Sequence, residues 1–564
     1  MARAAIWART LQPIPTSQHL FRALTEVRKR AWRPILPALV RHWRADAAQL
    51  VALVRPARLA RLARALQTAL GPRAAEVGEL VLAGRPVGRV EALDWQLTGL
   101  SPLQVYEAHY LEWTVDLAAS DEARLDVALS RWQRASVASR QAWEPYPRAR
   151  RVLATLRAAA LVQRPTLRTK LLIEAAAAWL GLDWLVERHL DGNHLLLDRV
   201  AAAAGEALFE RGTVRMARLF DELARQFDRE GGHCEASPMY HAVACEDLLT
   251  LETLLRDGPE RQLLGIELKR YVAWLRAARH ADGTLPGFGD SDALALDALP
   301  LSRADLQLPI PVAPRLDGLG SLWSCAAPDE RLVVHTAPPV WQPQPGHAHD
   351  DTFAVEWSWA GRRWLADAGL SGYDGDPHRA LCRSNECHST VAVAGNPALE
   401  LWGSFRVGRR GQVRPVRRGT ADGWRWMHGM HLWPAEPFAR QTLVHHRLVG
   451  WRPGALWVCD RVTLKPSEAA VRAQQRWVLA PGVELNDGPQ GFVQLQSGDS
   501  RLYATATRDF QVGLSPRFAL RQRTADGPCL AVDVDEVGVW AGFAAESAEL
   551  TAVPAALQTL WLAT

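Results

Sequence analysis

The spacing of apolar residues changes once along the chain, and this change most constrains the fold. From about Pro15 to about Arg279, apolar residues recur at intervals of three and four, as in Leu153 and Leu156, among many alanines, arginines and glutamates. Such spacing gathers apolar side chains on one face of an α-helix. The first half is therefore predicted to be a series of amphipathic helices. No fixed repeat length is seen, which argues against a regular solenoid.

After about Arg279 the composition of the chain and the spacing of its apolar residues change. Between Asp282 and Gly320 the chain is rich in Pro, Gly and Asp, which is typical of a connector. Beyond it, short alternating runs such as 331–335, 353–357 and 455–458 are separated by turn residues, which indicates antiparallel strands. Since 564 residues exceed what one core holds, we expect a multidomain α+β protein. The predicted division is a helical domain at 1–300, a linker at 301–320 and an antiparallel β-sandwich at 321–564.

The charge balance is mildly basic. The formal net charge is +5, and only four of the 66 basic residues are lysines. The planar guanidinium fork suits carboxylates and sulfates, although genome composition alone also produces such a preference. The charge balance would fit an anionic glycan as partner, but composition alone does not single one out.

Several features bear on the compartment. Seven cysteines without a CxxC pair favour reduced thiols over a disulfide framework. The longest apolar stretch, 171–182, is interrupted by Glu174 and is too short to span a bilayer. No signal peptide is recognised, so the expected location is the cytoplasm, or the periplasm if a leader was removed.

Two polar clusters lie within the helical half. The first, Asp191-Gly192-Asn193-His194, precedes an apolar run, so its polar residues suit either a helix cap or a binding site. The second, residues 231–241, carries two His, a Glu and Tyr240 on a glycine-started loop that leads into a helix. A buried tyrosine is also common for structural reasons, but so many ionisable groups on one loop favour a site.

A third cluster lies in the β half. It comprises Gly346-His347-Ala348-His349-Asp350-Asp351, then Asp367, then His388. In an extended segment His347 and His349 point to the same side. Two imidazoles and a carboxylate, here His349, His388 and Asp367, are a common zinc set, although an isolated HxH pair is not specific for metal.

Together the three clusters resemble the heparinase II/III superfamily, which includes related alginate and oligoalginate lyases. The resemblance runs from about residue 150 to about 450 and includes the order and spacing of the elements. It implies an incomplete (α/α) toroid followed by a β-sandwich, and a polysaccharide lyase activity. The implied partner is an acidic polysaccharide or oligosaccharide substrate and no nucleic acid, and a homodimer is left open. The chain departs from the family pattern at Cys234, Ala236 and Ser389, which leaves the pocket shape and the substrate open.

The resemblance also implies roles for individual residues. Asn193 and His194 would contact the substrate carboxyl group, while Tyr240 and His347 would transfer protons. His349, Asp367 and His388 would hold a mainly structural Zn²⁺. Further substrate-binding candidates are Glu235, His241, Arg379, Arg383, Arg406 and Trp402, for which ordinary packing is the competing interpretation.

β-Elimination explains why such residues are needed. The C5 proton of a uronic acid is weakly acidic, so a neutral or cationic group must stabilise the charge that grows on the carboxylate. A base must reach C5, and an acid must reach the leaving oxygen at C4. We favour His347 as base and Tyr240 as acid, but syn and anti elimination, endo and exo cleavage and the polymer itself are left open.

Two other functions are compatible with the sequence. A metal-dependent hydrolase would use His347, His349 and Asp350 to activate water. A non-catalytic glycan-binding protein of cell-surface polysaccharide biosynthesis would bind oligosaccharides without turnover.

Overall fold

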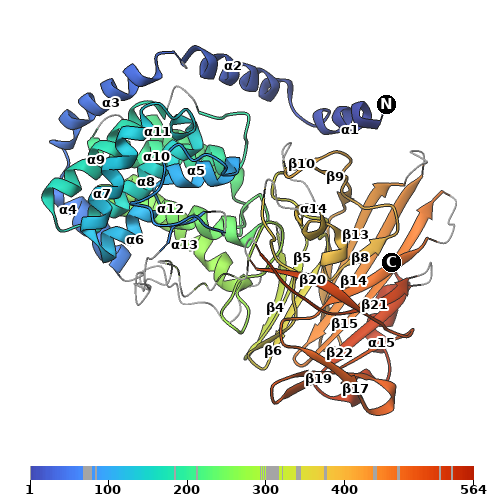
Figure 1. Ribbon diagram of the computed structural model, residues 1–564. Helices are drawn as coiled ribbons and strands as arrows, with labels where there is room; N and C mark the ends of the chain where they lie inside the picture. Colours follow the sequence, from blue (N-terminus) through green and yellow to red (C-terminus); the bar gives the residue numbers. More distant parts are fainter. Residues whose placement is uncertain are drawn as a thin grey trace.

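The computed structural model has a helical half followed by an antiparallel β half, which confirms the predicted fold class (Figure 1). The structure describes residues 2–32, 34–67, 79–82, 85–182, 186–210, 214–292, 294, 296, 299, 301, 317–319, 322–337, 345–373, 378–435, 441–466, 471–519, 522–534 and 538–564. Most of the predicted linker at 301–320, including Pro309 and Pro311, lies outside these residues.

Helices account for most of the described residues before residue 280. Their bounds are α1 Ala2–Leu11, α2 Thr16–Trp32, α3 Leu36–Val51, α4 Pro56–Gln67, α5 Pro102–Tyr110, α6 Trp113–Ser120, α7 Glu122–Ser136, α8 Pro145–Leu161, α9 Pro165–Leu180, α10 Asn193–Phe209, α11 Val214–Gln226, α12 Pro238–Leu254 and α13 Pro259–Ala278. One short hairpin, β1 (Val81–Leu82) with β2 (Arg85–Pro86), interrupts them. The helical region therefore begins earlier than the sequence pattern predicted.

Within its described residues, the β half contains three larger antiparallel sheets, one two-stranded sheet and two short α-helices. The strands are β3 Asp317–Leu319, β4 Leu322–Ala327, β5 Glu330–His335, β6 Val355–Trp359, β7 Arg362–Leu365, β8 Val391–Val393, β9 Leu401–Trp402, β10 Arg406–Val407, β11 Gln412–Val413, β12 Arg417–Ala421, β13 Trp424–Pro434, β14 Thr442–Arg452, β15 Ala455–Lys465, β16 Ala473–Val478, β17 Glu484–Asp487, β18 Val493–Ser497, β19 Ser500–Ala506, β20 Gln511–Ala519, β21 Gln522–Val534 and β22 Val539–Ala544. The helices are α14 Arg379–Cys382 and α15 Ala555–Leu562.

The strands of the β half pair into separate sheets. The largest sheet has nine strands in the order β11-β13-β14-β15-β22-β19-β18-β17, with β12 also paired to β13. A four-stranded sheet has the order β20-β21-β16-β8, and a five-stranded sheet runs from β3 to β7; β9 and β10 form a separate hairpin.

The five-stranded sheet joins the two halves because its strands are apolar on both faces. Along β5, Leu332 and Val334 pack in the core of the sandwich, whereas Val333 between them packs in the core of the helical half. Side chains alternate across a strand, so a run of consecutive apolar residues buries both faces. Polar contacts reinforce the junction: Ser324 donates to the carbonyl of Ala277, and His280 Nδ1 lies 3.1 Å from Ser358 Oγ.

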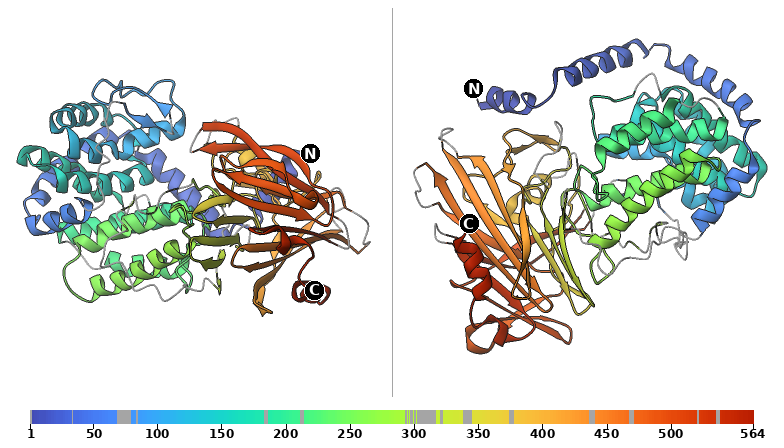
Figure 2. Two further views of the ribbon diagram at one scale, coloured as in Figure 1. Left: turned by 90° about the horizontal axis from the view of Figure 1, so that it is seen from below. Right: turned by 180° about the vertical axis from the view of Figure 1, so that it is seen from behind.

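Helices α1 to α3 arch from the β half over the helical half (Figures 1 and 2). At the β end, Trp7 packs edge-on against Trp402, with ring centroids 4.7 Å apart, and Arg406 lies 4.8 Å from both rings. Trp402 Nε1 donates to Thr10 Oγ1 at 2.9 Å. At the other end, Lys29 of α2 pairs with Glu187 at 3.2 Å. The arm therefore contacts both halves of the molecule.

No helix in the described residues has the length and apolar character needed to cross a bilayer. None of the seven cysteines, all of which lie in the described part of the chain, forms a disulfide bond.

A buried ionic network fixes the centre of the sandwich. Asp460 on β15 accepts hydrogen bonds from Arg447 and His445, each at 2.7 Å, and from Gln475 at 2.8 Å. The same guanidinium donates to the carbonyls of Phe353 and Ser389, both at 2.8 Å. Burial alone would raise the pKa of Asp460, but Arg447 and His445 hold it well below its ordinary value. The network thereby ties the large sheet to the two loops that carry the third polar cluster.

We predict that Asp460→Asn lowers the free energy of unfolding by about 3 kcal/mol at neutral pH, because Arg447 then lacks a buried counter-charge. Since the folded-state pKa is depressed, this stabilisation is fully present above the ordinary carboxyl pKa of about 4 and is lost as the pH falls from there through the folded-state pKa. Urea denaturation should therefore separate the two proteins widely at pH 7 and less as acid is added. Asp533→Asn, an exposed change on β21, serves as control; equal stability of the Asp460 variant and wild type would contradict the prediction.

We also predict that Trp402→Ala loosens the contact of α1 with the β half, because it removes a ring contact, a cation–π contact and a hydrogen bond. Hydrogen exchange of the backbone amides of Ala2–Leu11, followed by mass spectrometry, should accelerate about tenfold. Trp426→Ala, a change at a half-buried tryptophan on β13 in a different core cluster, should leave this exchange unchanged. Unaltered exchange in the Trp402 variant would show that α1 is held by other contacts.

Candidate functional site

Tyr240 lies in the first turn of α12, where its position is set by a helix cap. Ser237 accepts from the backbone N–H of Tyr240 at 3.2 Å, and Pro238 occupies the first helical position. The Ser237 hydroxyl also donates to the carbonyl of Asp290 at 2.9 Å. The start of α12 is thereby attached to the loop that leaves the helical half.

Tyr240 faces His347, which comes from the β half. Their ring centroids are 3.9 Å apart, and the Tyr240 hydroxyl lies 2.8 Å from the hydroxyl of Tyr373. The fold therefore brings together the tyrosine and the histidine that the sequence placed 107 positions apart, at 240 and 347. Burial raises the pKa of Tyr240 well above its ordinary value, and Tyr373 and Asp290 raise it further, so the phenol keeps its proton at neutral pH.

One carboxylate organises this side of the site. Asp290 is fully buried and accepts from His347 Nδ1 and from His349 Nε2, each at 2.8 Å, and it forms a two-pronged ion pair with Arg379. Burial alone would raise the pKa of Asp290, but Arg379 and the two imidazoles hold it well below its ordinary value. An ionised carboxylate only accepts, so His347 carries a proton on Nδ1 and, when neutral, presents an unprotonated Nε2.

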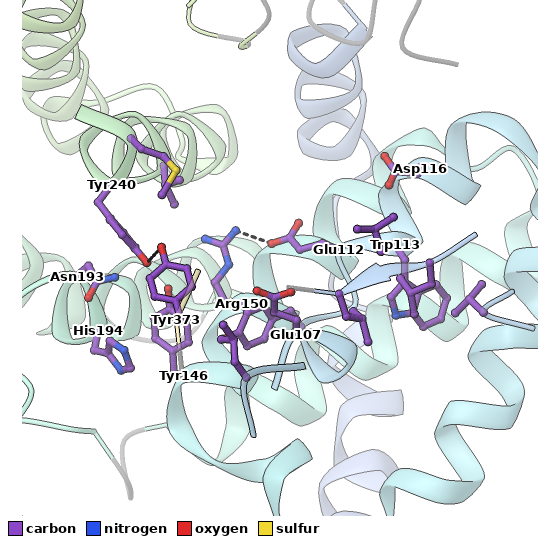
Figure 3. A pocket seen from close by; sticks show the side chains of 18 of the residues that line it. Glu107, Glu112, Trp113, Asp116, Tyr146, Arg150, Asn193, His194, Tyr240 and Tyr373 are labelled. Atoms are coloured by element: carbon purple, nitrogen blue, oxygen red, sulfur yellow. Dashed lines mark hydrogen bonds and ion pairs between the residues drawn. The ribbon is translucent and has the colours of Figure 1, made fainter. Parts of the chain in front are cut away.

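Asn193 and His194 begin α10 and line the same cavity as Tyr240 and His347 (Figure 3). Gly192 before them has a φ of +133°, and a Cβ there would collide with the Glu235 carboxylate, so glycine is required. Glu235 accepts from the backbone N–H of Asn193 at 2.8 Å. His194 stacks on Tyr146 with ring centroids 4.0 Å apart.

The cavity has a volume of about 730 Å³ and runs between the helical half and the β half. Its walls come from the loop at 79–82, from α5, α6, α8, α10 and α12, and from the β half through His347, Tyr373 and Phe405. Figure 3 shows the hydroxyls of Tyr240 and Tyr373 directed toward one another, with Asn193 and His194 beside them.

Other sequence-predicted residues lie outside the cavity walls. His241 is 1% exposed, stacks on Trp274 and is 3.1 Å from the carbonyl of Tyr271. Arg383 is buried and donates to the carbonyls of Ala348 and Ser404. Their burial and partners account for both side chains as packing residues.

The remaining candidates, like those above, do not line the cavity, and each has another contact. Arg379 is the buried partner of Asp290, and Glu235 holds the backbone of Asn193, with Oε2 at 3.9 Å from His347 Nε2. Arg406 and Trp402 contact α1, as described above.

Sequence reasoning assigned no role to two residues of the site. Asp290 ends the segment Pro286-Gly287-Phe288-Gly289-Asp290, which was interpreted as part of a connector although it is one of the elements in which the chain resembles the family. Tyr373 lay outside all three polar clusters.

The predicted zinc residues lie together behind His347. The rings of His349 and His388 are 5.4 Å apart, and His349 Nδ1 and His388 Nε2 are buried without a hydrogen-bond partner. Asp367 is 2.6 Å from His388 Nδ1. Two imidazole nitrogens thus suit a metal, while the carboxylate is engaged by one of the imidazoles. Within the described residues, no three His, Cys, Asp or Glu side chains are gathered as a ready-made metal site.

Comparisons with known proteins place these features in context. Residues 326–527 match the family described as Heparinase II/III-like, C-terminal. The solved structure of heparinase III aligns with a TM-score of 0.62 and 12% identity, covering 86% of this chain and 84% of that chain. The heparan sulfate lyase HepC from Pedobacter heparinus aligns with a TM-score of 0.54 and 16% identity, covering 91% and 88%. No curated protein matches the chain in sequence. At these identities the structural likeness shows a shared fold.

Proposed function

Because the chain carries a C-terminal domain of the heparinase II/III-like family, we propose that it is a polysaccharide lyase that cleaves a uronic-acid glycan by β-elimination. The observation that carries the proposal is the contact of Tyr240 with His347, at 3.9 Å between ring centroids, in one cavity with Asn193 and His194. A donor, an acceptor and two groups able to bind a carboxylate therefore line the same space.

In the proposed reaction His347 acts as the base. Its Nδ1 proton is held by Asp290, which leaves Nε2 to take the proton from C5 of the uronic acid. Asp290 is a positioning residue: it fixes the ring orientation and favours the imidazolium that forms, without touching the substrate.

Tyr240 acts as the acid. As the C5 proton leaves, the electron pair forms the C4–C5 double bond and the C4–oxygen bond breaks. The phenol supplies the proton that the leaving oxygen needs. Its raised pKa means that this proton is in place when the substrate binds at neutral pH. Tyr373, 2.8 Å from the Tyr240 hydroxyl, orients that hydroxyl and is a route for its reprotonation.

Asn193 and His194 would hold the substrate carboxylate. Both begin α10, where backbone N–H groups and the helix dipole favour negative charge. An amide and an imidazole beside the developing enolate lower the barrier to removal of the C5 proton.

We also propose that His349, His388 and Asp367 hold a zinc ion with a mainly structural role. Support comes from the two buried ring nitrogens that lack hydrogen-bond partners. The bound metal would neutralise buried carboxylates and brace the loop that carries His347. A hydrolytic role is less well supported, because His349 and Asp350 are 1% and 3% exposed and neither lines the cavity.

The lyase proposal is tested with a panel of uronic-acid polymers, following the ultraviolet absorbance of the unsaturated product. On the polymer that reacts, Tyr240→Phe and His347→Ala should each lower kcat/KM at least about 100-fold, because each removes one proton-transfer group. Tyr503→Phe makes the same chemical change on β19 and should leave the rate unaltered. Full activity in the two site variants, or no unsaturated product from any uronic-acid polymer, would refute the proposal.

The zinc proposal is tested by elemental analysis of protein expressed with zinc. We expect about one zinc ion per chain, its loss in His388→Ala, and a lower unfolding temperature after chelation. His42→Ala, at an exposed histidine of α3, should keep the metal. Zinc-free protein with an unfolding temperature that chelator does not change would exclude the site.

A further inference from the structure

Helix α2 is amphipathic in the opposite sense to its neighbour α3. The buried residues of α3 are apolar and include Val40, Trp43 and Leu50. In α2 the buried residues are Gln18 and Thr25, both of which are polar. A surface helix normally buries its apolar face and exposes its polar face. Because α2 turns polar side chains toward the protein, packing within the chain does not account for most of its apolar residues.

Polar contacts hold the inner face of α2 against the helical half. Lys29 Nζ lies 3.2 Å from a carboxylate oxygen of Glu187. Gln18 Nε2 lies 3.5 Å from Asp191 Oδ2. Gln18, Thr25 and Lys29 are spaced i, i+7 and i+11, which places them on one side of a helix. These contacts set the rotation of α2 about its axis, so the opposite side faces away from the protein.

That outer side of α2 is apolar. Leu20, Leu24 and Val27 are 58%, 42% and 62% exposed. Their spacing of i, i+4 and i+7 puts them on one line, and the exposed Ala23 and Ala31 widen it into a stripe, called the apolar stripe below. In Figure 1 and in the right view of Figure 2, α2 lies at the outer edge of the molecule. A contiguous exposed apolar surface of this kind is typical of a site of interaction.

The segment that contains α2 is basic. Residues 1–45 include nine basic residues and one acidic residue, Glu26, a formal charge of +8 against +5 for the whole chain. Some of these cations are paired within the protein, as Arg44 is with Glu174. Arg22 and Arg30 of α2 are exposed, and no ion pair joins either of them to another described residue. The exposed charge available on α2 is therefore mainly positive.

An apolar stripe accompanied by arginines fits the surface of an anionic lipid bilayer. In such a helix the stripe enters the boundary between headgroups and acyl chains, while the guanidiniums contact lipid phosphates. The α2 helix of a second copy fits less well, because two helices of the same positive charge would lie side by side. Three large apolar side chains also supply only part of the roughly 1,000 Å² that a stable interface between proteins buries.

We propose that α2 attaches the protein to the surface of membranes that contain anionic lipid, with Leu20, Leu24 and Val27 inserted between the headgroups. This role is separate from the proposed lyase function and does not depend on it. The attached helix lies close to the candidate site, because Glu187 on its inner side is also 3.3 Å from His194 of the cavity.

Flotation of the full-length protein with lipid vesicles tests the proposal. Vesicles of phosphatidylcholine with about 30% phosphatidylglycerol should bind the protein at least about tenfold more tightly than vesicles of phosphatidylcholine alone. Leu20→Gln combined with Val27→Gln should weaken binding to the anionic vesicles about tenfold, because two side chains no longer insert. Arg22→Gln combined with Arg30→Gln should weaken it about fivefold, because two contacts with lipid phosphates are lost.

Leu263→Gln combined with Ile266→Gln is the matched control on α13. These two side chains are 54% and 62% exposed, so the same chemical change at similar exposure should leave vesicle binding unaltered. No binding to anionic vesicles, equal binding to both kinds of vesicle, or full binding by either α2 double variant would overturn the proposal. A dimer of the wild-type protein that the Leu20 and Val27 changes convert to a monomer, without vesicle binding by either form, would instead assign the apolar stripe to a second copy.

Discussion

The buried carboxylate of Asp290 is the interaction on which the arrangement of the site depends. Asp290 lies on the segment that follows the helical half, and its backbone carbonyl accepts a hydrogen bond from Ser237. Its carboxylate accepts hydrogen bonds from His347, His349 and Arg379, all of which belong to the β half. A fully buried carboxylate is unfavourable unless every lone pair has a donor. The hydrogen bonds to Asp290 fix the position of His347 relative to Tyr240. The burial of one carboxylate therefore aligns the two domains.

The shared five-stranded sheet makes this alignment rigid. Val333 belongs to the helical core and Leu332 to the sandwich core, so neither half can shift without exposing apolar surface of the other. Arg447 extends the constraint by joining Asp460 to the carbonyls of Phe353 and Ser389, next to the loops of His349 and His388. The segment that carries the proposed catalytic histidine is therefore held by the five-stranded sheet and by the hydrogen bonds of Arg447.

The sequence predicted the fold well because the spacing of apolar residues, which distinguishes helices from strands, can be recognised between residues that are near one another in the sequence. It also placed His347 and His349 on one side, on the premise that their segment is extended. The structure has a turn at 346 and 347 instead, yet each imidazole donates to one carboxylate oxygen of Asp290. The partner itself could not be predicted, because it lies 57 and 59 positions from the histidines and a lone aspartate in a loop has no distinctive pattern. Tyr373 was missed for the same reason, since it meets Tyr240 across 133 positions.

Composition was a poor guide to the residues that line the cavity, and the reason is where the arginines lie: Arg379, Arg383 and Arg406 are all absent from its described walls. Arg148 is fully buried, donates to the carbonyls of Ala178 and Gly181 and lies 4.5 Å from the ring of Trp43. Arg383 is used in the same way in the β half. A guanidinium that satisfies interior carbonyls adds to the net charge of the chain but is not available to contact a ligand. The net charge therefore says little about the side chains that line the cavity, because those side chains are selected by the fold and not by composition.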